Sequence, residues 1–325
     1  MLRVAFAGTF AARLEALVRA QLGVPCEIVC DDEDGVVGKL AEMDVLVSMG
    51  FTSAMGRAAR RLKLVQVPGA GLDRIDRAAL PKGAFLANAY GHEAGIAEFV
   101  MGAILALTRD YARLDAGLRR GEWLSQWALG RLMPPPAVEL AGKTLGILGH
   151  GRIGAAVAKR ARGFDMAVIG HRRSPVTAEL GETLVHGRDG LDELLRRSDV
   201  LVVAAALTPE TRGMLGEREL RLLRPSALLV NIARAEIIDP DALYRALAER
   251  RIAAAALDVW YRYPSAPGPV LPAAQPFHEL PNVLMTPHVS GWTEGMLEAR
   301  AKLIAENVGR IARGHPPLNQ IAVTE

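Results

Sequence analysis

The chain reads Thr144-Leu-Gly-Ile-Leu-Gly-His-Gly-Arg-Ile-Gly154 near its middle. Its glycines follow the spacing Gly149-x-Gly151-x-x-Gly154, directly after an apolar run and directly before the helix-prone residues 155–162. In a strand–turn–helix unit the first glycine permits a tight turn, the second lets the backbone approach a pyrophosphate, and the third lets helix and strand pack closely. The helix dipole and the N–H groups of its first turn favour the anion. The stretch therefore predicts a dinucleotide-binding site.

The position of this turn predicts two domains. The chain has 325 residues, enough for two domains of ordinary size, and a long stretch precedes the turn. Strand-like and helix-like segments alternate on both sides of it, as in parallel sheets covered by helices. We expect an α/β fold of two doubly wound parallel-sheet domains, in which a Rossmann cofactor domain (residues 101–291) is inserted into a flavodoxin-like substrate domain (residues 1–100 plus 292–325). Residues 93–119 predict one long helix or two abutting ones, and residues 133–136 a connector.

Composition excludes several classes of protein. Hydrophobic residues make up 50% of the chain and charged residues 23%, and the net charge is only +3, which argues against nucleic acid as a partner. Apolar runs stay shorter than a membrane span, and residues 1–10 resemble a first strand more than a signal peptide. Cys26 and Cys30 are expected to be reduced packing residues rather than a disulfide or a metal site. These features predict a cytoplasmic protein without a metal.

The end of the second strand of this unit bears on the choice of cofactor. NAD-binding units carry an Asp or Glu about 20 residues past the glycines, where it bonds the ribose hydroxyls. Here the strand at residues 166–170 is followed by His171-Arg172-Arg173-Ser174. A 2′-phosphate is repelled by a carboxylate and bound by a guanidinium fork. The sequence therefore predicts NADP(H), bound near His171, Arg172 and Arg173. The alternative is NAD(H), with the arginines as ordinary surface charges.

Four further stretches make the pattern specific: Gly69-Ala-Gly-Leu-Asp-Arg-Ile-Asp76, Leu207-Thr-Pro-Glu-Thr-Arg212, Asn231-Ile-Ala-Arg-Ala-Glu-Ile-Ile-Asp239 and Asn282-Val-Leu-Met-Thr-Pro-His-Val-Ser-Gly291. Taken in order with the glycine turn, they resemble the D-isomer-specific 2-hydroxyacid dehydrogenases over nearly the whole chain. That family includes glyoxylate/hydroxypyruvate reductases, phosphoglycerate dehydrogenases and formate dehydrogenases. The resemblance implies hydride transfer between a nicotinamide cofactor and a small 2-oxo or 2-hydroxy acid such as glyoxylate or hydroxypyruvate. It also implies a homodimer, and the apolar face of residues 93–119 is either its seam or part of the ordinary core.

The residues required for this chemistry are present. Reducing a 2-oxo acid needs an anchor for the carboxylate, a cation to polarise the ketone and an acid to protonate the new alkoxide. Arg234 has the planar fork that can hold carboxylate and carbonyl together, and His288 is the natural acid near neutral pH. The resemblance implies that the backbone amides of Ala70 and Gly71 cradle the substrate carboxylate.

The same resemblance implies the surroundings of the cofactor. The implied contacts are Arg152 and Ile153 at the pyrophosphate, Ala205 and Ala206 beside the adenosine, Ile232, Ala233 and Asp258 around the nicotinamide, and Gly291 close to that ring. The side-chain pocket of the substrate is expected to involve Phe51, residues 88–92 and Trp292.

One position departs from the family pattern. Most members carry a Glu just before Pro in a D-V-F-x-x-E-P stretch, and this Glu pairs with the catalytic His. Here Asp258-Val-Trp-Tyr-Arg-Tyr-Pro264 places Tyr263 at that position. A carboxylate favours the charged form of a paired imidazole, whereas a phenol does so far less but can still orient the ring. We therefore expect less of the protonated form of His288 to be present near neutral pH, and activity to fall away at lower pH than in relatives that carry the Glu.

Two other functions remain open. Formate dehydrogenases also lack this Glu, and their Asp-Val-Trp and Pro-His-x-Ser-Gly are echoed by Asp258-Val-Trp260 and Pro287-His-Val-Ser-Gly291. Formate oxidation needs no proton on an alkoxide, but this chain is shorter than typical formate dehydrogenases. A cofactor-binding regulator with weakened catalysis is the second alternative. The presence of both Arg234 and His288 favours the enzyme.

Overall fold

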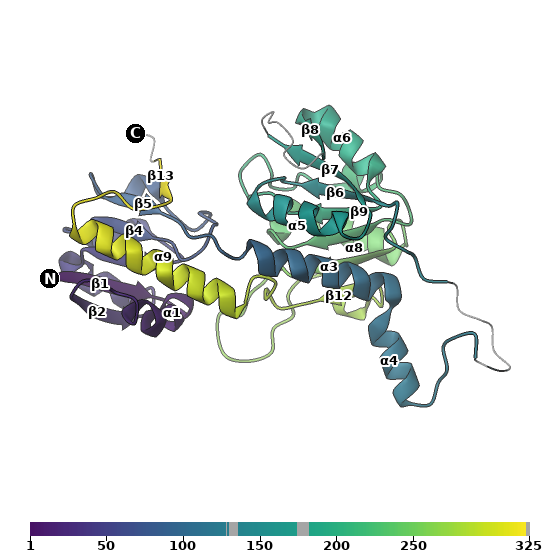
Figure 1. Cartoon of the computed structure of the whole chain (residues 1–325), viewed down its shortest axis with the longest axis horizontal. Helices are drawn as coiled ribbons and strands as arrows, with labels where there is room; N and C mark the ends of the chain where they lie inside the picture. The colour runs from purple at the N-terminus through teal and green to yellow at the C-terminus, as the bar shows by residue number, and fades with distance from the viewer. Residues whose placement is uncertain (128, 130–135, 174–181, 323–325) are drawn as a thin grey trace. The chain divides into compact units, whose positions relative to one another are not determined.

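The computed structural model describes residues 1–127, 129, 136–173 and 182–322 (Figure 1). Most of the predicted connector at 133–136 and Ser174 lie outside this range. The chain forms two compact units: unit 1 comprises Met1–His92 and Trp292–Glu325, and unit 2 comprises Glu93–Gly291. Unit 2 is thus continuous in sequence and interrupts unit 1.

Unit 1 is built on a six-stranded sheet with the order β13-β5-β4-β3-β1-β2, parallel except for β13. Helices cover both of its faces, α1 and α9 on one, and the 3₁₀ helix η1 with α2 on the other. The strands are β1 (Leu2–Ala7), β2 (Cys26–Asp31), β3 (Val45–Ser48), β4 (Leu64–Gln66), β5 (Phe85–Ala87) and β13 (Gln320–Ile321). The helices are α1 (Thr9–Arg19), η1 (Gly35–Glu42), α2 (Ser53–Ala58), η2 (Arg77–Ala79) and α9 (Glu294–Ala312).

Unit 2 contains a seven-stranded, fully parallel sheet with the order β12-β11-β10-β9-β6-β7-β8. Helices α3 and α5 pack on one face and α6, α7 and α8 on the other. The strands are β6 (Thr144–Leu148), β7 (Ala167–Arg172), β8 (Thr183–His186), β9 (Val200–Val203), β10 (Leu228–Asn231), β11 (Ala254–Leu257) and β12 (Val283–Met285). The helices are α3 (Glu93–Arg109), α4 (Tyr111–Arg119), α5 (Arg152–Arg162), α6 (Gly187–Arg197), α7 (Glu217–Leu220), η3 (Ala235–Ile237), α8 (Pro240–Ala248) and η4 (Phe277–Glu279).

The predicted fold class is confirmed, because both sheets are doubly wound and unit 2 has the strand order of a Rossmann domain. The structure differs in where unit 2 begins. A boundary at residue 100 would cut through α3, whereas the whole helix belongs to unit 2, because Ile96, Val100 and Ile104 are buried in the same core as α5. The region at 93–119 is two helices, since Asp110 adopts a left-handed conformation with φ of +52° between α3 and α4.

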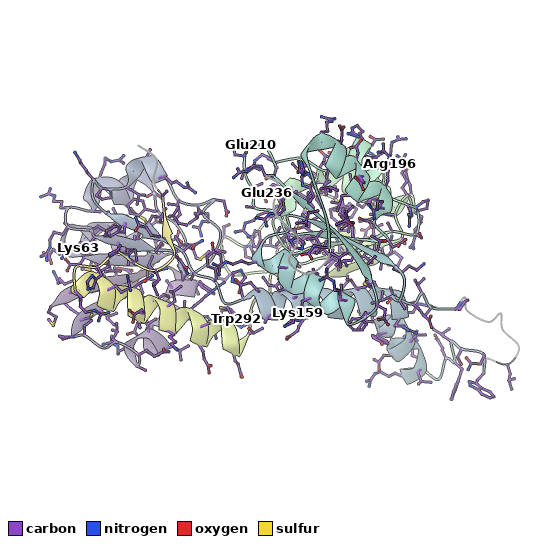
Figure 2. All side chains as sticks on the ribbon, turned by 45° about the horizontal axis from the view of Figure 1, so that its top comes forward. Lys63, Lys159, Arg196, Glu210, Glu236 and Trp292 are labelled. Carbon is purple, nitrogen blue, oxygen red and sulfur yellow. The ribbon has the colours of Figure 1, made fainter. Side chains whose placement is uncertain are left out.

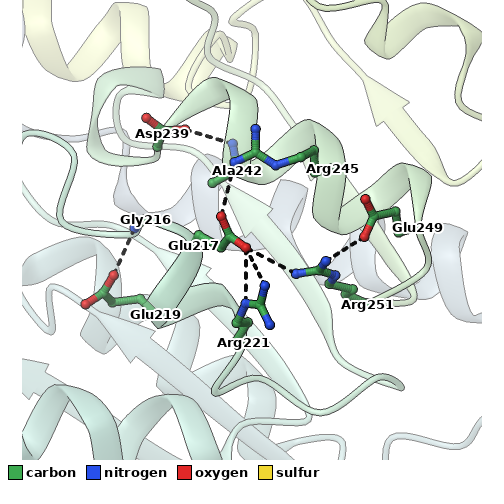
Figure 3. A network of polar contacts seen from close by, with 9 residues as sticks. All are labelled: Gly216, Glu217, Glu219, Arg221, Asp239, Ala242, Arg245, Glu249 and Arg251. Atoms are coloured by element: carbon green, nitrogen blue, oxygen red, sulfur yellow. Dashed lines mark hydrogen bonds and ion pairs between the residues drawn. The ribbon is translucent and has the colours of Figure 1, made fainter.

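A polar network on the surface of unit 2 ties α7 to α8 (Figure 3). The Glu217 carboxylate accepts hydrogen bonds from Arg221 at 2.5 Å and from Arg245 at 3.3 Å. Helix α8 begins where the Asp239 side chain accepts a bond from the backbone N–H of Ala242 at 2.7 Å, a standard N-terminal cap. Exposed ion pairs each stabilise little, but together they hold α7 against α8.

In the part of the chain that the structure describes, none of the helices combines the length and apolar character needed to span a membrane.

Candidate active site

The turn after β6 can be made only by glycine at its first position. Gly149 has a φ of +95°, and a Cβ there would lie 2.3 Å from the backbone nitrogen of Ala205. The N–H of Gly149 donates to the carbonyl of His171 at 3.1 Å. A Cβ on Gly154 would lie 3.0 Å from the carbonyl oxygen of Gly149. A side chain at either position would collide with the backbone, so glycine is what allows the end of β6, the turn and α5 to pack this closely.

The start of α5 fits a dinucleotide pyrophosphate. Arg152 and Ile153 are its first two residues, and among the described residues no side chain caps its first turn. A Cβ placed on Gly151 would meet no described atom within 4 Å, so the backbone there faces free space. Ile153 packs against the core of unit 2, so its contribution to an anion would come from its backbone N–H. A helix N-terminus with this opening is a ready anion site.

Three neighbouring basic residues at the end of β7 differ in how far their side chains are buried. The ring of His171 is buried, and its Nε2 lies 2.9 Å from the carbonyl oxygen of Gly187. We therefore correct the expected role of His171: it holds the glycine turn through its carbonyl and does not present its ring to a 2′-phosphate. Arg172 is half-buried and Arg173 is exposed, so both side chains remain candidates for that phosphate.

The carboxylate of Glu210 lies near Arg173. The Thr208 hydroxyl lowers the pKa of Glu210 below its usual value, and the charge of Arg173 lowers it further. Glu210 lies in the loop that follows β9, and Glu236 lies in the 3₁₀ helix η3 that follows β10 (Figure 2). In the same β9 loop, Ala205 is half-buried, and the exposed Ala206 accepts a bond from Thr211 through its carbonyl at 2.7 Å.

The structure places Tyr263 against His288. The Tyr263 hydroxyl oxygen lies 2.8 Å from His288 Nδ1, and it accepts a bond from the backbone N–H of Trp260 at 3.3 Å. Because the phenol oxygen already accepts from Trp260, its own hydrogen is free to donate to Nδ1, which leaves the hydrogen of a neutral imidazole on Nε2. His288 itself has a φ of +58°.

The phenol stays neutral at physiological pH. Burial raises the pKa of Tyr263, an effect that the bond from Trp260 and the charge of Arg234 partly offset and the charges of Asp258 and Glu236 reinforce. Half of the Tyr263 side chain is nevertheless exposed, at 51%, so the group lies at the surface of unit 2. His288 thus has a neutral partner that can either donate or accept a hydrogen bond.

The loop that carries Arg234 is shaped by a buried amide. Asn231, the last residue of β10, donates from its side chain to the carbonyl of Arg234 at 3.0 Å and accepts from the N–H of Ala233 at 3.1 Å. The Arg234 guanidinium donates to the carbonyl of Ala233 at 2.8 Å. Ile232 is buried in the core with α3 and α5. Sequence reasoning missed Asn231, although an amide that ends a buried strand is a usable signal.

A second buried polar residue supports the loop that carries His288. Asp258, directly after β11, is fully buried and accepts three hydrogen bonds from residues 286–290. Trp260 donates from its indole nitrogen to the carbonyl of Thr286 at 2.8 Å. Gly291 follows in a turn. Thr286 and Trp260 were also missed, because their partners lie far away in sequence.

The predicted substrate cradle lies in unit 1. Ala70 and Gly71 follow β4, and the side chain of Asn88 donates to the carbonyl of Ala70 at 3.1 Å. The expectation that Phe51 lines the side-chain pocket is wrong, because Phe51 is fully buried in the core of unit 1. Trp292 packs edge-on against the ring of Phe10, with centroids 5.8 Å apart.

The candidate residues of unit 2 share one edge of its sheet. They lie just beyond the carboxyl ends of six strands: β6 at Gly149, β7 at Arg173, β9 at Ala205, β10 at Arg234, β11 at Asp258 and β12 at His288. Ligands of open α/β sheets bind at this edge. The glycine turn of a Rossmann unit, a loop that carries Arg234, and His288 with its ring hydrogen-bonded to Tyr263 define a dinucleotide-dependent oxidoreductase.

Comparison with known proteins identifies the family. Residues 101–290 match the model of the D-isomer specific 2-hydroxyacid dehydrogenase NAD binding domain. The chain belongs to the D-isomer specific 2-hydroxyacid dehydrogenase family. It is an NAD(P)-dependent oxidoreductase acting on small 2-hydroxy or 2-oxo acids.

Individual relatives cover most of the chain. It is 36% identical over 284 residues to a glyoxylate reductase of Thermococcus gammatolerans, an alignment that covers 86% of this chain and 83% of the relative. It is 37% identical to a D-3-phosphoglycerate dehydrogenase of Methanocaldococcus jannaschii but spans only about half of it, 52%. A solved structure of an NADPH-dependent glyoxylate/hydroxypyruvate reductase from Sinorhizobium meliloti, in complex with NADP and malonate, has a TM-score of 0.82 at 26% identity, covering 99% of this chain and 97% of that one.

Proposed function

We propose that the protein is an NADPH-dependent reductase of glyoxylate or hydroxypyruvate. The observation that carries the cofactor preference is the pair Arg172 and Arg173 at the tip of β7, where two guanidinium groups are available to a 2′-phosphate. The substrate class is supported by relatives named glyoxylate reductase and by the Sinorhizobium meliloti reductase that binds NADP.

The roles of the residues follow from the chemistry of carbonyl reduction. The bound nicotinamide supplies a hydride. As the hydride adds to the carbonyl carbon, the π electron pair of the C=O bond moves to oxygen, which takes a proton from Nε2 of His288 in its charged form. Arg234 holds the substrate carboxylate and carbonyl oxygen with its planar fork. The backbone amides of Ala70 and Gly71 are the proposed second anchor for the carboxylate.

Tyr263 serves His288 in both protonation states. When the imidazole is neutral with its hydrogen on Nε2, the phenol donates to Nδ1. In the charged imidazole, and in the neutral form left after Nε2 gives up its proton, Nδ1–H donates to the phenol oxygen, whose hydrogen rotates away. The ring of His288 keeps its orientation throughout the cycle. The phenol adds no negative charge, so the imidazolium is less favoured than beside a carboxylate.

The test is a kinetic comparison of NADPH and NADH across glyoxylate, hydroxypyruvate, pyruvate and bulkier 2-oxo acids. We expect a higher kcat/KM with NADPH and with the small substrates. Arg173→Glu places a carboxylate beside the 2′-phosphate and should lower kcat/KM for NADPH far more than for NADH; Lys159→Glu, a charge change on the exposed side of α5, is the matched control. Equal efficiency of the two cofactors in the wild type would refute the role of the arginine pair.

The same assays separate the alternatives. Tight NADPH binding without turnover of any oxo acid would indicate a cofactor-binding regulator, and reduction of NADP⁺ or NAD⁺ by formate would indicate a formate dehydrogenase.

We also propose that the protein is a homodimer. Helix α4 and the segment after it extend away from the sheet of unit 2 (Figure 1), and this arm, residues 111–127, exposes Tyr111, Leu118, Trp123 and Trp127. A groove of about 820 Å³, mostly apolar, lies beside it, lined by Leu107, Leu140 and Leu284 among others. Each copy thus offers both an apolar arm and an apolar groove, which suits a two-fold symmetric interface between identical chains.

A further inference from the structure

We propose that Asn88 is a positioning residue for the substrate carboxylate, because it sets the direction of the backbone amides of Ala70 and Gly71. The sequence predicted residues 88–92 near the side-chain pocket of the substrate, whereas the side-chain amide of Asn88 bonds the proposed carboxylate cradle itself. This inference rests on the proposed function only in taking these two backbone amides as the second anchor of the carboxylate.

Two hydrogen bonds hold consecutive carbonyl groups of the cradle. The N–H of Ala89 donates to the carbonyl of Gly69 at 3.0 Å, and Nδ2 of Asn88 donates to the carbonyl of Ala70 at 3.1 Å. Both donors belong to the segment that directly follows β5. The two carbonyls therefore face the same segment.

The direction of the N–H groups follows from the geometry of the peptide. In a trans peptide the C=O and N–H bonds point to opposite sides, and no cis peptide bond occurs among the described residues. The N–H of Ala70 shares a peptide with the carbonyl of Gly69, and the N–H of Gly71 shares one with the carbonyl of Ala70. Both N–H groups thus point away from the segment after β5, and neither donates to another backbone group in the described part of the chain. Successive N–H groups that face one side bind anions.

Asn88 carries a cost that an apolar residue would avoid. It is 2% exposed, and its NH₂ group must face Ala70, because turning Oδ1 there would oppose two acceptors. Oδ1 is left buried, without a hydrogen-bond partner among the described residues. A buried acceptor without a partner lowers stability, and such a group in a native protein calls for an explanation. What the amide provides, and an apolar side chain could not, is the bond to Ala70.

The backbone of Asn88 is itself held by the C-terminal part of unit 1. Its N–H donates to the carbonyl of Asn319 at 3.3 Å. The preceding residue, Leu318, is held through its N–H and its carbonyl by the fully buried side chain of Asn307 in α9, at 2.7 and 3.1 Å. Hydrogen bonds thus connect α9 to the cradle through the C-terminal segment and Asn88.

Asn88→Leu is the primary test. Leucine has a similar size but no donor, so the carbonyl of Ala70 is released and the N–H of Gly71 loses its direction. Losing a hydrogen bond to a charged group weakens binding about 10- to 100-fold. We expect the KM of glyoxylate and of hydroxypyruvate to rise by this factor, and kcat to change less, because the carboxylate is bound in the ground state and in the transition state alike. The Kd of NADPH should not change.

The same variant separates positioning from a general structural role. It removes the bond to Ala70 together with the unpaired acceptor, and these two losses act on stability in opposite directions. The Tm should therefore stay close to that of the wild type while KM rises. An unchanged KM in Asn88→Leu would overturn the proposal.

Asn88→Asp keeps the proposal falsifiable if Asn88→Leu folds poorly. An ionised carboxylate cannot donate to the carbonyl of Ala70, whereas a protonated carboxyl can, and burial raises the pKa of such a group into the range of the assay. The ratio of kcat/KM in this variant to that in the wild type should therefore be lowest at high pH and rise as the pH falls. A ratio that stays low at every pH would contradict the role of the donated bond.

Asn282→Leu is the matched control. Asn282 is also buried, its side-chain amide donates to the carbonyls of Leu247 at 3.2 Å and Ala253 at 3.0 Å, and its Oδ1 has no partner among the described residues. It lies at the amino end of β12 in unit 2, at the opposite edge of the sheet from the candidate site. This variant should leave KM and kcat unchanged.

A binding measurement makes the test independent of turnover. The probe is oxamate, a carboxylate that resembles a 2-oxo acid, added to the complex of the protein with NADP⁺. In protein labelled with ¹³C at the alanine carbonyl and ¹⁵N in glycine, only Ala–Gly pairs are detected, and Gly71 is the second residue of one such pair. Oxamate should shift the Gly71 amide signal in the wild type and in Asn282→Leu, and in Asn88→Leu its Kd should rise about 10- to 100-fold.

The outcomes distinguish this inference from the proposed function. If the wild type turned over none of the 2-oxo acids but oxamate shifted Gly71, the proposed reaction would fail while the Kd values of oxamate would still decide the role of Asn88. A Gly71 signal that oxamate leaves in place in the wild type, or an equal Kd in the wild type and Asn88→Leu, would overturn the inference.

Discussion

At the scale of single residues, the exchange of a carboxylate for Tyr263 changes the charge beside the catalytic imidazole but keeps its hydrogen bond. The 2.8 Å contact with Nδ1 and the raised pKa of the phenol, caused first by burial, give the imidazole a neutral partner. A glutamate would both orient the imidazole and stabilise its charged form, whereas the phenol of this protein does only the first.

Tyr263→Glu should restore a charged partner. A carboxylate favours the imidazolium, so the acid form of His288 persists to higher pH and the fall of kcat/KM on the basic side moves to higher pH. A pH–rate profile of glyoxylate reduction measures this shift. Tyr263→Phe is the control, since it removes the bond without adding charge; loss of one hydrogen bond of about 1 kcal/mol should lower kcat several-fold without that shift. Superimposable pH–rate profiles for the wild type and Tyr263→Glu would refute the claim that the charge of the partner controls the protonation of His288.

The sequence identified the residues that carry the chemistry better than the residues that hold them in place. Arg234, His288 and Tyr263 stand in motifs of fixed spacing, so their residue types could be interpreted directly. Asn231, Thr286 and Trp260 act through bonds to residues that only the fold brings near, such as Thr286 to Asp258 at 2.7 Å. The role of His171 was missed for the same reason, because its ring nitrogen bonds the carbonyl of Gly187, a residue of α6 that is distant in sequence.

At the scale of elements, the turn from β6 to α5 combines two glycines with different tasks. Gly149 is required by the fold, because its φ is positive and a Cβ would contact Ala205. Gly151 is an extended N-cap residue whose Cβ would point into free space among the described residues. One glycine therefore makes the turn, and the other leaves room for a phosphate.

Two substitutions separate these tasks. Gly149→Ala should lower the Tm of the protein without cofactor by several degrees, since forcing the conformation costs about 1–3 kcal/mol, and should weaken NADPH binding as well. Gly151→Ala should leave that Tm unchanged and raise only the Kd of NADPH. Thermal unfolding without cofactor and fluorescence titration with NADPH give both quantities. An equal loss of Tm in the two variants would contradict this division.

Short elements were the least predictable part of the fold. Apolar spacing predicts a helix at Gly35–Glu42, but the structure forms the 3₁₀ helix η1 there. Strands β8 and β13 lie at the edges of their sheets and contain no fully buried residue, so no apolar run marks them in the sequence. The long amphipathic helices and the buried strands were predicted well, because a core of parallel strands leaves continuous apolar runs in the sequence.

At the scale of the whole molecule, two units with separate cores are joined by two crossings of the chain, at His92–Glu93 and Gly291–Trp292. Arg234, His288 and the glycine turn belong to unit 2, and Ala70 and Gly71 belong to unit 1. The proposed reaction thus divides its tasks, with the acid and the cofactor turn on one unit and the second carboxylate anchor on the other.

The exposed arm of unit 2 makes the oligomeric state testable. Trp127 is 69% exposed in the single chain, and its burial in a second copy would contribute free energy to a dimer. Light scattering after size-exclusion chromatography should give twice the chain mass of 34.9 kDa for the wild type and a monomer for Trp123→Ser with Trp127→Ser. Trp292→Ser, at an exposed tryptophan of unit 1, is the control and should remain a dimer. A monomeric wild type would contradict the proposed interface.

Hydride transfer to a 2-oxo acid is tested most directly by following the label. With hydroxypyruvate and NADPH that carries deuterium at both C4 positions of the nicotinamide, the product should be D-glycerate with one deuterium at C2, identified by mass spectrometry and chiral chromatography, and Arg234→Ala and His288→Ala should abolish its formation. Glycerate formed without deuterium at C2, or undiminished labelling in either variant, would contradict the account.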